Sequence, residues 1–362
     1  MSNLDYTYVA KSFYCVGSSL KKCFGCEYCR LLDGSPEQEY LTLPTQVNEN
    51  FRNIPVAVNI FYGDPLLQID KTVEYLHLLE KEKHKGPVII ITKGNFKLFP
   101  DIKFDLDLHI AFSTFGIDHI YDGGTWNRFL SNLFQIKERK NNYHYSIEFR
   151  PICFGINDSY HILENIFKVA SEYNLCIGYS GLQGKDDIVK IWEKEGIDLN
   201  PYPGYTFGHL KPLSNEIESN IRYLAKQYEV NIFHKTSCLI SYVHNLESDY
   251  NCHYYRPNEV ECSSCPMNNK CNSKKDELRP ITSIPFEYTL EYKMKHECSL
   301  KSMNLCKYPT DECSNISGYV LKIDEQLTAG DYRMIKWLTG YTVDNKFIQD
   351  ERLNEKWQLN NL

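Results

Sequence analysis

Short runs of strand-forming residues alternate with amphipathic stretches from about residue 8 to residue 230. The strand candidates are rich in Val, Ile, Phe and Tyr, as buried parallel strands are. They cover residues 8–16, 56–61, 88–92, 108–113, 145–151 and 175–179. Apolar residues at helical spacing lie between several of these runs, at residues 66–83, 160–173 and 216–228. The alternation predicts an α/β fold, with a parallel sheet and right-handed crossovers.

About six strand–helix units fit before residue 230, which is too few for a closed eight-stranded barrel. An open, partial barrel and a doubly wound sheet both remain, and both bind ligands at the carboxyl ends of their strands. After about residue 232 the chain turns to Cys, Asn, Pro and charged residues, and mixed strand and helix patterns return near residue 284, with a helix expected at 332–338. We therefore expect a barrel over residues 1–231, a cysteine-rich metal-cluster region over 232–283 and a small α+β region over 284–362.

The net charge and the hydropathy of the chain restrict the classes of partner and the cellular location that we expect. The net charge of −7 argues against nucleic acid as a partner, because a nucleic-acid binder usually carries a basic surface. The first ten residues lack the apolar stretch of a signal peptide, and no run approaches the roughly 18 apolar residues of a membrane span. We expect a cytoplasmic protein that does not enter the membrane.

The chain has 14 cysteines, which in a reducing compartment favours metal ligation over disulfides where they cluster. The first cluster is Cys23, Cys26 and Cys29, with two residues in each interval. Three thiolates at this spacing can wrap one inorganic cluster, and Gly25 eases the turn. Three ligands leave one metal position open for a substrate. The alternatives are a zinc loop completed by Cys15 or a distant residue, and cysteines without metal.

This loop resembles the cysteine loop of the radical S-adenosylmethionine (radical SAM) superfamily, which follows the first strand of a partial six-unit barrel. Cys26, Tyr28 and Cys29 match the last two cysteines of that loop and the aromatic residue before the final one. The first interval departs from the family, which usually has three residues there; a one-residue deletion or the use of Cys15 would account for the difference. The resemblance implies a partial (β/α)6 barrel that holds a [4Fe-4S] cluster and S-adenosylmethionine.

A second motif supports the resemblance, which spans about residues 8 to 210. The segment Tyr62-Gly63-Asp64-Pro65 ends the second strand and resembles the family's Gly-Gly-Glu-Pro motif, which meets the amino group of the cofactor. Gly63 permits close backbone approach and Asp64 can pair with an ammonium group. The alternative is an ordinary strand-end turn.

Later strand ends agree with the family's order of motifs. The resemblance implies that Ser113 contacts the ribose of the cofactor and that Arg150 holds its carboxylate. A salt bridge at the edge of the core is the alternative for Arg150. The implied cofactor-binding set is Tyr28, Tyr62, Gly63, Asp64, Pro65, Ser113 and Arg150.

A second cysteine cluster, Cys262, Cys265 and Cys271, resembles part of the auxiliary-cluster domain (SPASM or twitch type) of radical enzymes that modify peptides. Cys252 is the nearest candidate for a fourth ligand. We expect a second [4Fe-4S] cluster here, with zinc as the alternative, because thiolates suit both. Cys238 is the next candidate for that fourth ligand, whereas Cys153 and Cys176 lie in or beside expected strands and should be small core residues.

The resemblance implies an enzyme that reductively cleaves S-adenosylmethionine to a 5′-deoxyadenosyl radical, which abstracts hydrogen from a substrate. It also implies an electron donor such as flavodoxin or ferredoxin. A peptide or protein is the expected substrate, since the auxiliary cysteines and the acidic charge favour it. Two other functions remain: a radical SAM enzyme acting on a nucleotide or DNA lesion, and a non-catalytic zinc-binding interaction module.

Overall fold

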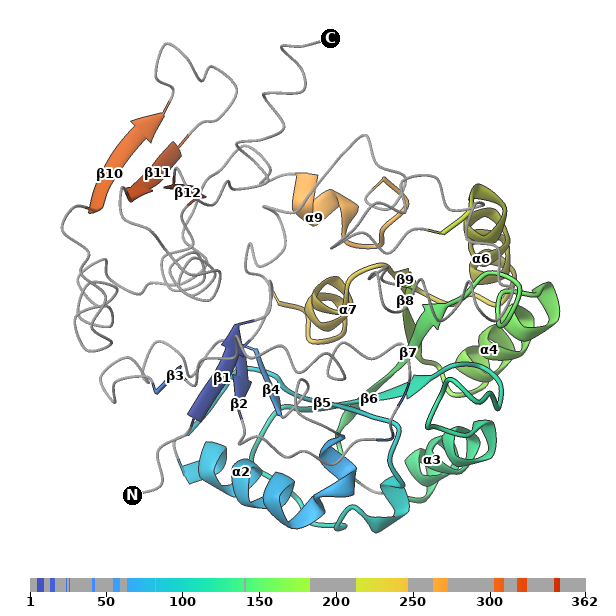
Figure 1. The fold of residues 1–362 in the computed structure, drawn as a ribbon. Helices are drawn as coiled ribbons and strands as arrows, with labels where there is room; N and C mark the ends of the chain where they lie inside the picture. The colour runs from blue at the N-terminus through green and yellow to red at the C-terminus, as the bar shows by residue number, and fades with distance from the viewer. Residues whose placement is uncertain are drawn as a thin grey trace, which may run out of the picture.

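A computed structural model gives the fold of the chain (Figure 1). It describes residues 5–9, 14–16, 24, 26, 41–42, 55–58, 64–81, 83–139, 141–182, 213–246, 263–272, 303–308, 318–323 and 342–345. Every structural statement below concerns these residues.

One large sheet organises the chain, and its strand order is β3-β1-β2-β4-β5-β6-β7-β8-β9. The strands are β1 (Asp5–Val9), β2 (Tyr14–Val16), β3 (Leu41–Thr42), β4 (Val56–Val58), β5 (Val88–Thr92), β6 (Leu108–Thr114), β7 (His144–Ile152), β8 (Cys176–Gly181) and β9 (Ile232–Phe233). Every pairing from β2 through β9 is parallel, whereas β1 pairs antiparallel with both β2 and β3.

The order of the parallel strands follows the chain without reversal. A doubly wound sheet reverses direction at one strand, so this alternative is wrong for the strands described here. The predicted α/β class is confirmed, and the open parallel sheet is compatible with a partial barrel.

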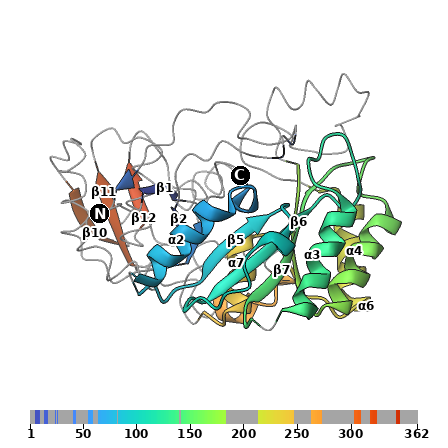
Figure 2. The same cartoon turned by 90° about the horizontal axis from the view of Figure 1, so that it is seen from below.

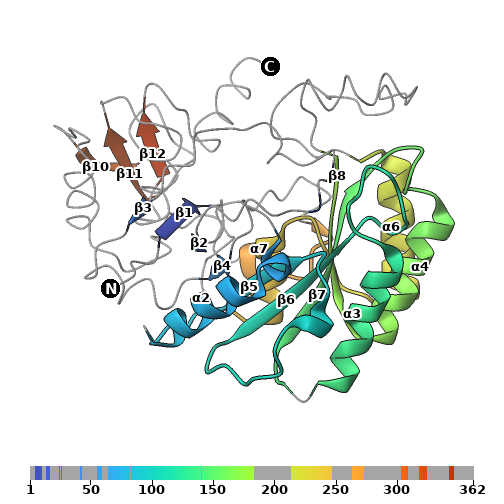
Figure 3. The same ribbon diagram turned by 60° about the horizontal axis from the view of Figure 1, so that its bottom comes forward.

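Four helices cover the outer face of this sheet (Figures 1 and 3). They are α2 (Ile69–Lys81), α3 (Trp126–Glu138), α4 (Tyr160–Glu172) and α6 (Asn215–Gln227). Figure 2 shows α3, α4 and α6 side by side. Helix α7 (Thr236–Val243) lies across the sheet from α2 and α3 and contacts β8 and β9. Two short 3-10 helices, η3 (Pro65–Leu67) and η4 (Phe96–Leu98), follow the ends of β4 and β5.

The two faces of the sheet differ in polarity. Residues in register on neighbouring strands share a face. The outer face carries large apolar side chains that are almost fully buried: Ile90, Ile110, Phe112, Ile147, Phe149 and Ile177. The inner face, toward α7, carries small and polar residues: His109, Ser113, Ser146, Glu148 and Gly178. Burial of the outer face supplies the core, and the inner face is where polar chemistry can gather.

The strand expected over residues 8–16 is wrong as one element. Two strands, β1 and β2, lie there in antiparallel register, with Val9 opposite Tyr14. Polar Lys11 and Ser12 interrupt the apolar run at this reversal. The other five strand predictions each find a strand, within a few residues at the ends.

The sequence pattern also missed elements. Helix α3 was not predicted, although Thr125 caps it by accepting a hydrogen bond from the Arg128 N–H. Strand β9 and helix α7 follow the expected boundary at residue 231 and belong to the large sheet and its covering layer.

The last described strands form a separate three-stranded sheet. Strand β11 (Gly318–Ile323) pairs antiparallel with β10 (Met303–Tyr308) and parallel with β12 (Thr342–Asn345). The helix expected at 332–338 lies outside the described residues. None of the described helices combines the length and the apolar character that crossing a bilayer requires.

Candidate functional site

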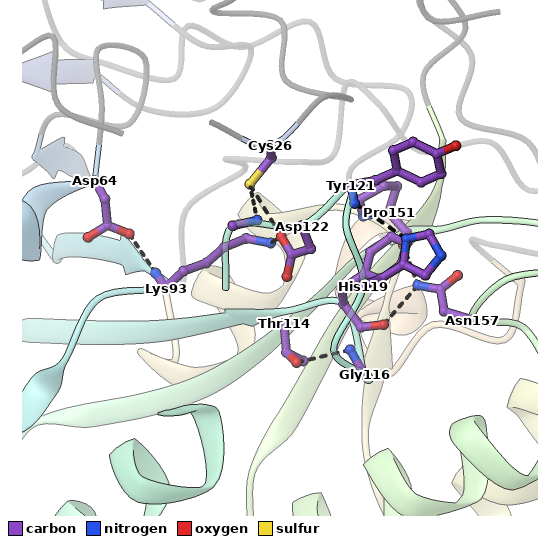
Figure 4. Close-up of polar contacts among 12 residues, drawn as sticks. Cys26, Asp64, Lys93, Thr114, Gly116, His119, Tyr121, Asp122, Pro151 and Asn157 are labelled. Atoms are coloured by element: carbon purple, nitrogen blue, oxygen red, sulfur yellow. Dashed lines mark hydrogen bonds and ion pairs between the residues drawn. The ribbon is translucent and has the colours of Figure 1, made fainter. Parts of the chain in front are cut away.

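Side chains from several segments meet at the carboxyl ends of β4, β5 and β6 (Figure 4). Asp64 joins the first two of these strand ends. Its carboxylate accepts hydrogen bonds from the Leu66 N–H (2.9 Å), the Thr92 hydroxyl (2.6 Å) and the Lys93 N–H (2.6 Å). Burial raises the pKa of Asp64 above its ordinary value, although these hydrogen bonds oppose the shift. Asp64 therefore fixes the turn after β4 against the end of β5.

Cys26 is the one cysteine of the first cluster (Cys23, Cys26 and Cys29) that lies among the described residues, and it is buried at this same edge. Its thiol lies 3.2 Å from Oδ1 of Asp122, in the loop after β6. The Gly123 N–H donates to Cys26 Sγ at 3.3 Å. Lys93 Nζ contacts the same Asp122 oxygen, so a cation, a carboxylate and a sulfur atom share one small region (Figure 4).

Gly123 fits closely against the cysteine loop. A Cβ at this position would lie 2.1 Å from the carbonyl oxygen of Phe24 and 2.3 Å from its Cβ. Arg128, at the start of α3, places its guanidinium 5.0 Å from the centre of the Phe24 ring. The loop after β6 and the first turn of α3 thus form the surface on which the described part of the cysteine loop rests.

Two buried asparagines hold the neighbouring loops. Asn132 of α3 accepts from the Phe96 N–H (2.8 Å) and donates to the Gly94 carbonyl (2.7 Å), which anchors the loop after β5. Asn157 accepts from the Cys153 N–H (2.6 Å) and donates to the carbonyls of Phe115 and Pro151, both at 2.9 Å. Each asparagine satisfies backbone groups that burial would otherwise leave unpaired.

Arg150 lies on β7 and contacts three protein groups. Its guanidinium contacts Glu148 at 2.9 Å, the Thr236 hydroxyl at 3.0 Å and the His234 carbonyl at 2.9 Å. These partners tie β7 to the start of α7. These contacts agree with the salt-bridge alternative for Arg150, and its contact with a cofactor carboxylate stays a prediction.

Ser113 and Glu148 lie opposite each other on the inner face, on neighbouring strands. Ser113 is half-buried, while Glu148 is 3% exposed. Among the described residues, no donor pairs with Oε1 of Glu148. Gly178 leaves room for this carboxylate, because a Cβ there would approach its oxygens to 2.8 Å. A buried acceptor without a partner is a place where a ligand donor can bind.

The remaining predicted site residues divide into two groups. Pro65 is buried at the start of η3, Cys265 is half-buried with its Sγ 3.4 Å from the Met267 N–H, and Cys271 lies in α9 (Asn268–Asn272). The others lie outside the described residues: Cys23, Tyr28, Cys29, Tyr62, Gly63, Cys252 and Cys262. Whether the cysteines converge therefore stays a prediction.

Two other cysteines lie in the core region, as expected. Cys153 follows β7 directly and is buried, and burial raises the pKa of its thiol well above the ordinary value. Burial also raises the pKa of Cys176 to about 11. Both thiols therefore stay protonated at neutral pH and are poor metal ligands in this state.

Sequence reasoning missed a histidine network at the opposite, amino-terminal edge of the sheet. His244 Nδ1 lies 2.7 Å from Oδ2 of Asp107, and His144 Nε2 lies 3.4 Å from Oδ1. His244 Nε2 lies 3.0 Å from His109 Nδ1, and His109 Nε2 lies 2.8 Å from Ser146 Oγ. The sequence contains one indication of this network, which is a histidine near the start of each of two successive strands, His109 and His144. His244 could not be linked to them because it lies one hundred residues after His144.

Burial and charge set the ionisation of this network. Burial works against the charge of Asp107, but the hydrogen bonds and charges of His144 and His244 outweigh it, and the pKa of Asp107 lies well below its ordinary value. Burial, together with the charges of the two neighbouring histidines, lowers the pKa of His109 well below 6.5. Asp107 is thus anionic and His109 neutral at pH 7.

Comparison with models of known protein families finds no match to this chain, and comparison with curated proteins finds none at a significant level. The function is therefore argued from the site itself.

Proposed function

We propose that this chain is a radical SAM enzyme whose [4Fe-4S] cluster is held by Cys23, Cys26 and Cys29. The observation that carries the proposal is the position of Cys26. It lies at the carboxyl edge of a parallel sheet whose strands follow chain order, against the loop after β6. In barrels and open parallel sheets this edge is where ligands and cofactors bind.

The surroundings of Cys26 suit a thiolate that ligates iron. Cysteine thiolates are the usual ligands of iron–sulfur clusters, and N–H groups that point at the sulfur tune the potential of the cluster. The Gly123 N–H supplies one such donor. A thiolate beside Asp122 would be repelled by its carboxylate, but Lys93 contacts the same carboxylate oxygen and offsets this charge.

The bound cluster would supply the electron that cleaves S-adenosylmethionine and yields a 5′-deoxyadenosyl radical. The protein's own residues position and enclose the reactants. Asp64 holds the turn after β4, which the resemblance assigns to the amino group of the cofactor, in a fixed position relative to Lys93. Ser113 and the unpaired oxygen of Glu148 present polar groups on the inner face for the ribose or the substrate.

The proposed substrate is a peptide or protein. The second cysteine segment carries this part of the proposal, because its pattern resembles that of peptide-modifying enzymes. Its described part contacts the main sheet's helices: Arg222 of α6 donates to the Ser264 hydroxyl at 3.3 Å, and Lys270 donates to the Asn245 side chain at 2.9 Å. An auxiliary cluster at Cys265 would therefore lie beside α6 and α7.

The test is anaerobic reconstitution of the full chain with iron and sulfide, followed by reduction with dithionite in the presence of S-adenosylmethionine. We expect about four iron atoms per cluster and release of 5′-deoxyadenosine. Cys26→Ala should abolish the release. Cys176→Ala is the matched control, because it removes a half-buried thiol on β8 that lies outside both cysteine clusters, and it should retain the release.

Two results would contradict the proposal. If Cys26→Ala still releases 5′-deoxyadenosine, the catalytic cluster is not held by this loop. Tight zinc content with no cleavage of S-adenosylmethionine after reconstitution would favour the zinc-binding interaction module. Turnover of a damaged oligonucleotide, with no reaction on peptides, would keep the radical chemistry but favour the nucleotide or DNA-lesion enzyme.

A further inference from the structure

We infer that Asp107, His144 and His244 form a further metal site, for a divalent transition-metal ion of the Zn²⁺ type, at the amino-terminal edge of the sheet. One potential ligand atom from each residue lies within 4.8 Å of the others. The site is distinct from both cysteine clusters, uses no thiolate and lies at the strand edge opposite Cys26.

The two imidazoles face the two oxygens of Asp107 at distances close to those around a tetrahedral ion, and a small rotation of the carboxylate would present one oxygen to both. Bonds of about 2.0–2.1 Å at tetrahedral angles place neighbouring ligand atoms about 3.3 Å apart. His144 Nε2 lies 3.4 Å from one oxygen of Asp107. His244 Nδ1 lies 2.7 Å from the other oxygen, a hydrogen-bond distance that would lengthen by roughly half an ångström as an ion replaces the proton.

A second observation points to a metal: the non-ligating nitrogen of His244 already has a partner of the required kind. Metal-bound histidines almost always donate from their other ring nitrogen to an acceptor, which fixes the tautomer and the orientation of the ring. His244 Nε2 lies 3.0 Å from Nδ1 of the fully buried His109. With Nδ1 of His244 on the metal, Nε2–H would donate to His109, and His109 would donate to Ser146 at 2.8 Å.

Rigid elements hold the three ligands. His144 is the first residue of β7, Asp107 directly precedes β6, and these two strands pair along their whole shared length. His244 caps the carboxyl end of α7, where the helix dipole favours a positive charge. A backbone turn with Asn245 at φ 47° ends the helix there, so the imidazole is directed by the local fold rather than by a long loop.

Exposure leaves one side of the site open. The side chain of His244 is 0% exposed, whereas those of Asp107 and His144 are 40% and 43% exposed. An ion bound here has three protein ligands and a coordination position that faces solvent. Imidazole nitrogen and carboxylate oxygen suit Zn²⁺ and its first-row neighbours. An iron–sulfur cluster, which prefers thiolate ligands, is not expected here.

The experiment titrates the purified full-length chain with Co²⁺, a coloured probe for zinc sites, and counts bound ion by dialysis. The wild-type protein should bind one equivalent more than His144→Ala, with the weak visible absorption of nitrogen and oxygen ligation in the difference spectrum. Any Co²⁺ bound by cysteines contributes equally to both proteins and cancels. His144 is half-exposed, so its removal should leave the fold intact. Asp107→Asn should lower the affinity for this additional Co²⁺ ion by about tenfold or more.

His77→Ala is the matched control. His77 is an exposed histidine that contacts Glu80 at 2.8 Å, so it has a carboxylate partner and lacks the second histidine. This variant should keep the full wild-type equivalents. Equal binding by the wild-type protein and His144→Ala would overturn the inference, as would an equal loss in His77→Ala. Because none of these residues lies near Cys26, failure of the radical SAM proposal would leave this result unaffected.

Discussion

Gly123 shows how one missing side chain can position a cysteine loop. Its Cα lies so close to Phe24 that the carbonyl oxygen of the loop occupies the place of a Cβ. The same residue offers its N–H to Cys26 Sγ. The Asp-Gly-Gly sequence at 122–124 reads as an ordinary turn, so its second role depends on a contact about one hundred residues away in the chain.

Gly123→Ala should displace the cysteine loop. The added methyl group cannot be accommodated at 2.1 Å from a backbone oxygen, so the loop must shift, at a cost of about 1–3 kcal/mol. We expect the thiol of Cys26 in the metal-free protein to react several-fold faster with an alkylating reagent, as measured by peptide mass spectrometry.

Gly124→Ala is the control for this change. A Cβ at this neighbour meets side-chain atoms of Asp122 and Lys93 at 3.0 Å or more and no backbone atom among its three nearest contacts. These side chains can move, so we expect the alkylation rate to stay within about twofold of wild type. Similar rates for all three proteins would contradict the packing of Phe24 on Gly123.

At the scale of elements, the sequence predicted best where burial is continuous. Strand β5 lies at the predicted residues because Val88 to Ile91 form an unbroken aliphatic run, the first three residues of which are fully buried. Strand β9 was not predicted because it has only two residues. Its pairing with β8, rather than its local propensity, makes it a strand. Local patterns do not contain such pairing.

The candidate site was predictable to a similar, partial extent. The cysteine spacing singled out Cys26 as a candidate ligand, because cluster ligands repeat at short intervals in the chain, and the structure places Cys26 beside the loop after β6. Asp122, Glu148 and the histidine network come together only through folding, from segments far apart in sequence. Arg150 has a clear sequence motif, but its partners Thr236 and His234 could not be read from it.

Glu218 connects α6 to the sheet by polar contacts, in addition to the buried apolar residues of this helix. Its carboxylate accepts from the Tyr179 hydroxyl at 3.1 Å and contacts His234 and Arg222, also at 3.1 Å. Burial opposes its charge, but the hydrogen bond and charge of His234, followed by the charge of Arg222, lower the pKa of Glu218 below 4.5. Its contribution to stability is therefore present above pH 4.5 and lost as the pH falls through its folded-state pKa.

Glu218→Gln should lower the free energy of unfolding at pH 7 by about 1–3 kcal/mol, because charged hydrogen bonds become neutral ones. The deficit should begin to shrink as the pH falls below about 4.5, where the carboxylate of the unfolded chain takes up a proton, and should disappear below the lower pKa of the folded state. Urea unfolding of both proteins between neutral and acidic pH measures this difference.

Glu172→Gln serves as the matched comparison. Glu172 is 59% exposed and contacts Lys137 at 2.8 Å, so solvent screens the pair. Its removal should change the unfolding free energy by less than about 0.5 kcal/mol at every pH. A Glu218→Gln deficit that stays constant down to acidic pH would show that packing, and not the charge of Glu218, holds α6 to the sheet.

At the scale of the whole molecule, the proposed histidine–aspartate site would hold together the amino-terminal edge of the large sheet. An ion that binds the native state and not the unfolded chain at a hundredfold excess over its dissociation constant stabilises the fold by about 2.7 kcal/mol. Saturating Zn²⁺ should therefore raise the midpoint of thermal unfolding of the wild-type protein by a few degrees more than that of His144→Ala. An equal rise in both proteins, measured by circular dichroism, would mean that zinc acts elsewhere.

Helix α7 connects the two ends of the sheet. Arg150 donates a hydrogen bond to Thr236, the first residue of α7, and His244 directly follows the last residue of this helix. Eight helical residues span about 12 Å and transmit displacement as a stiff rod. A displacement of His244 by a bound ion should therefore shift Thr236 and, through Arg150, the part of β7 that carries Glu148.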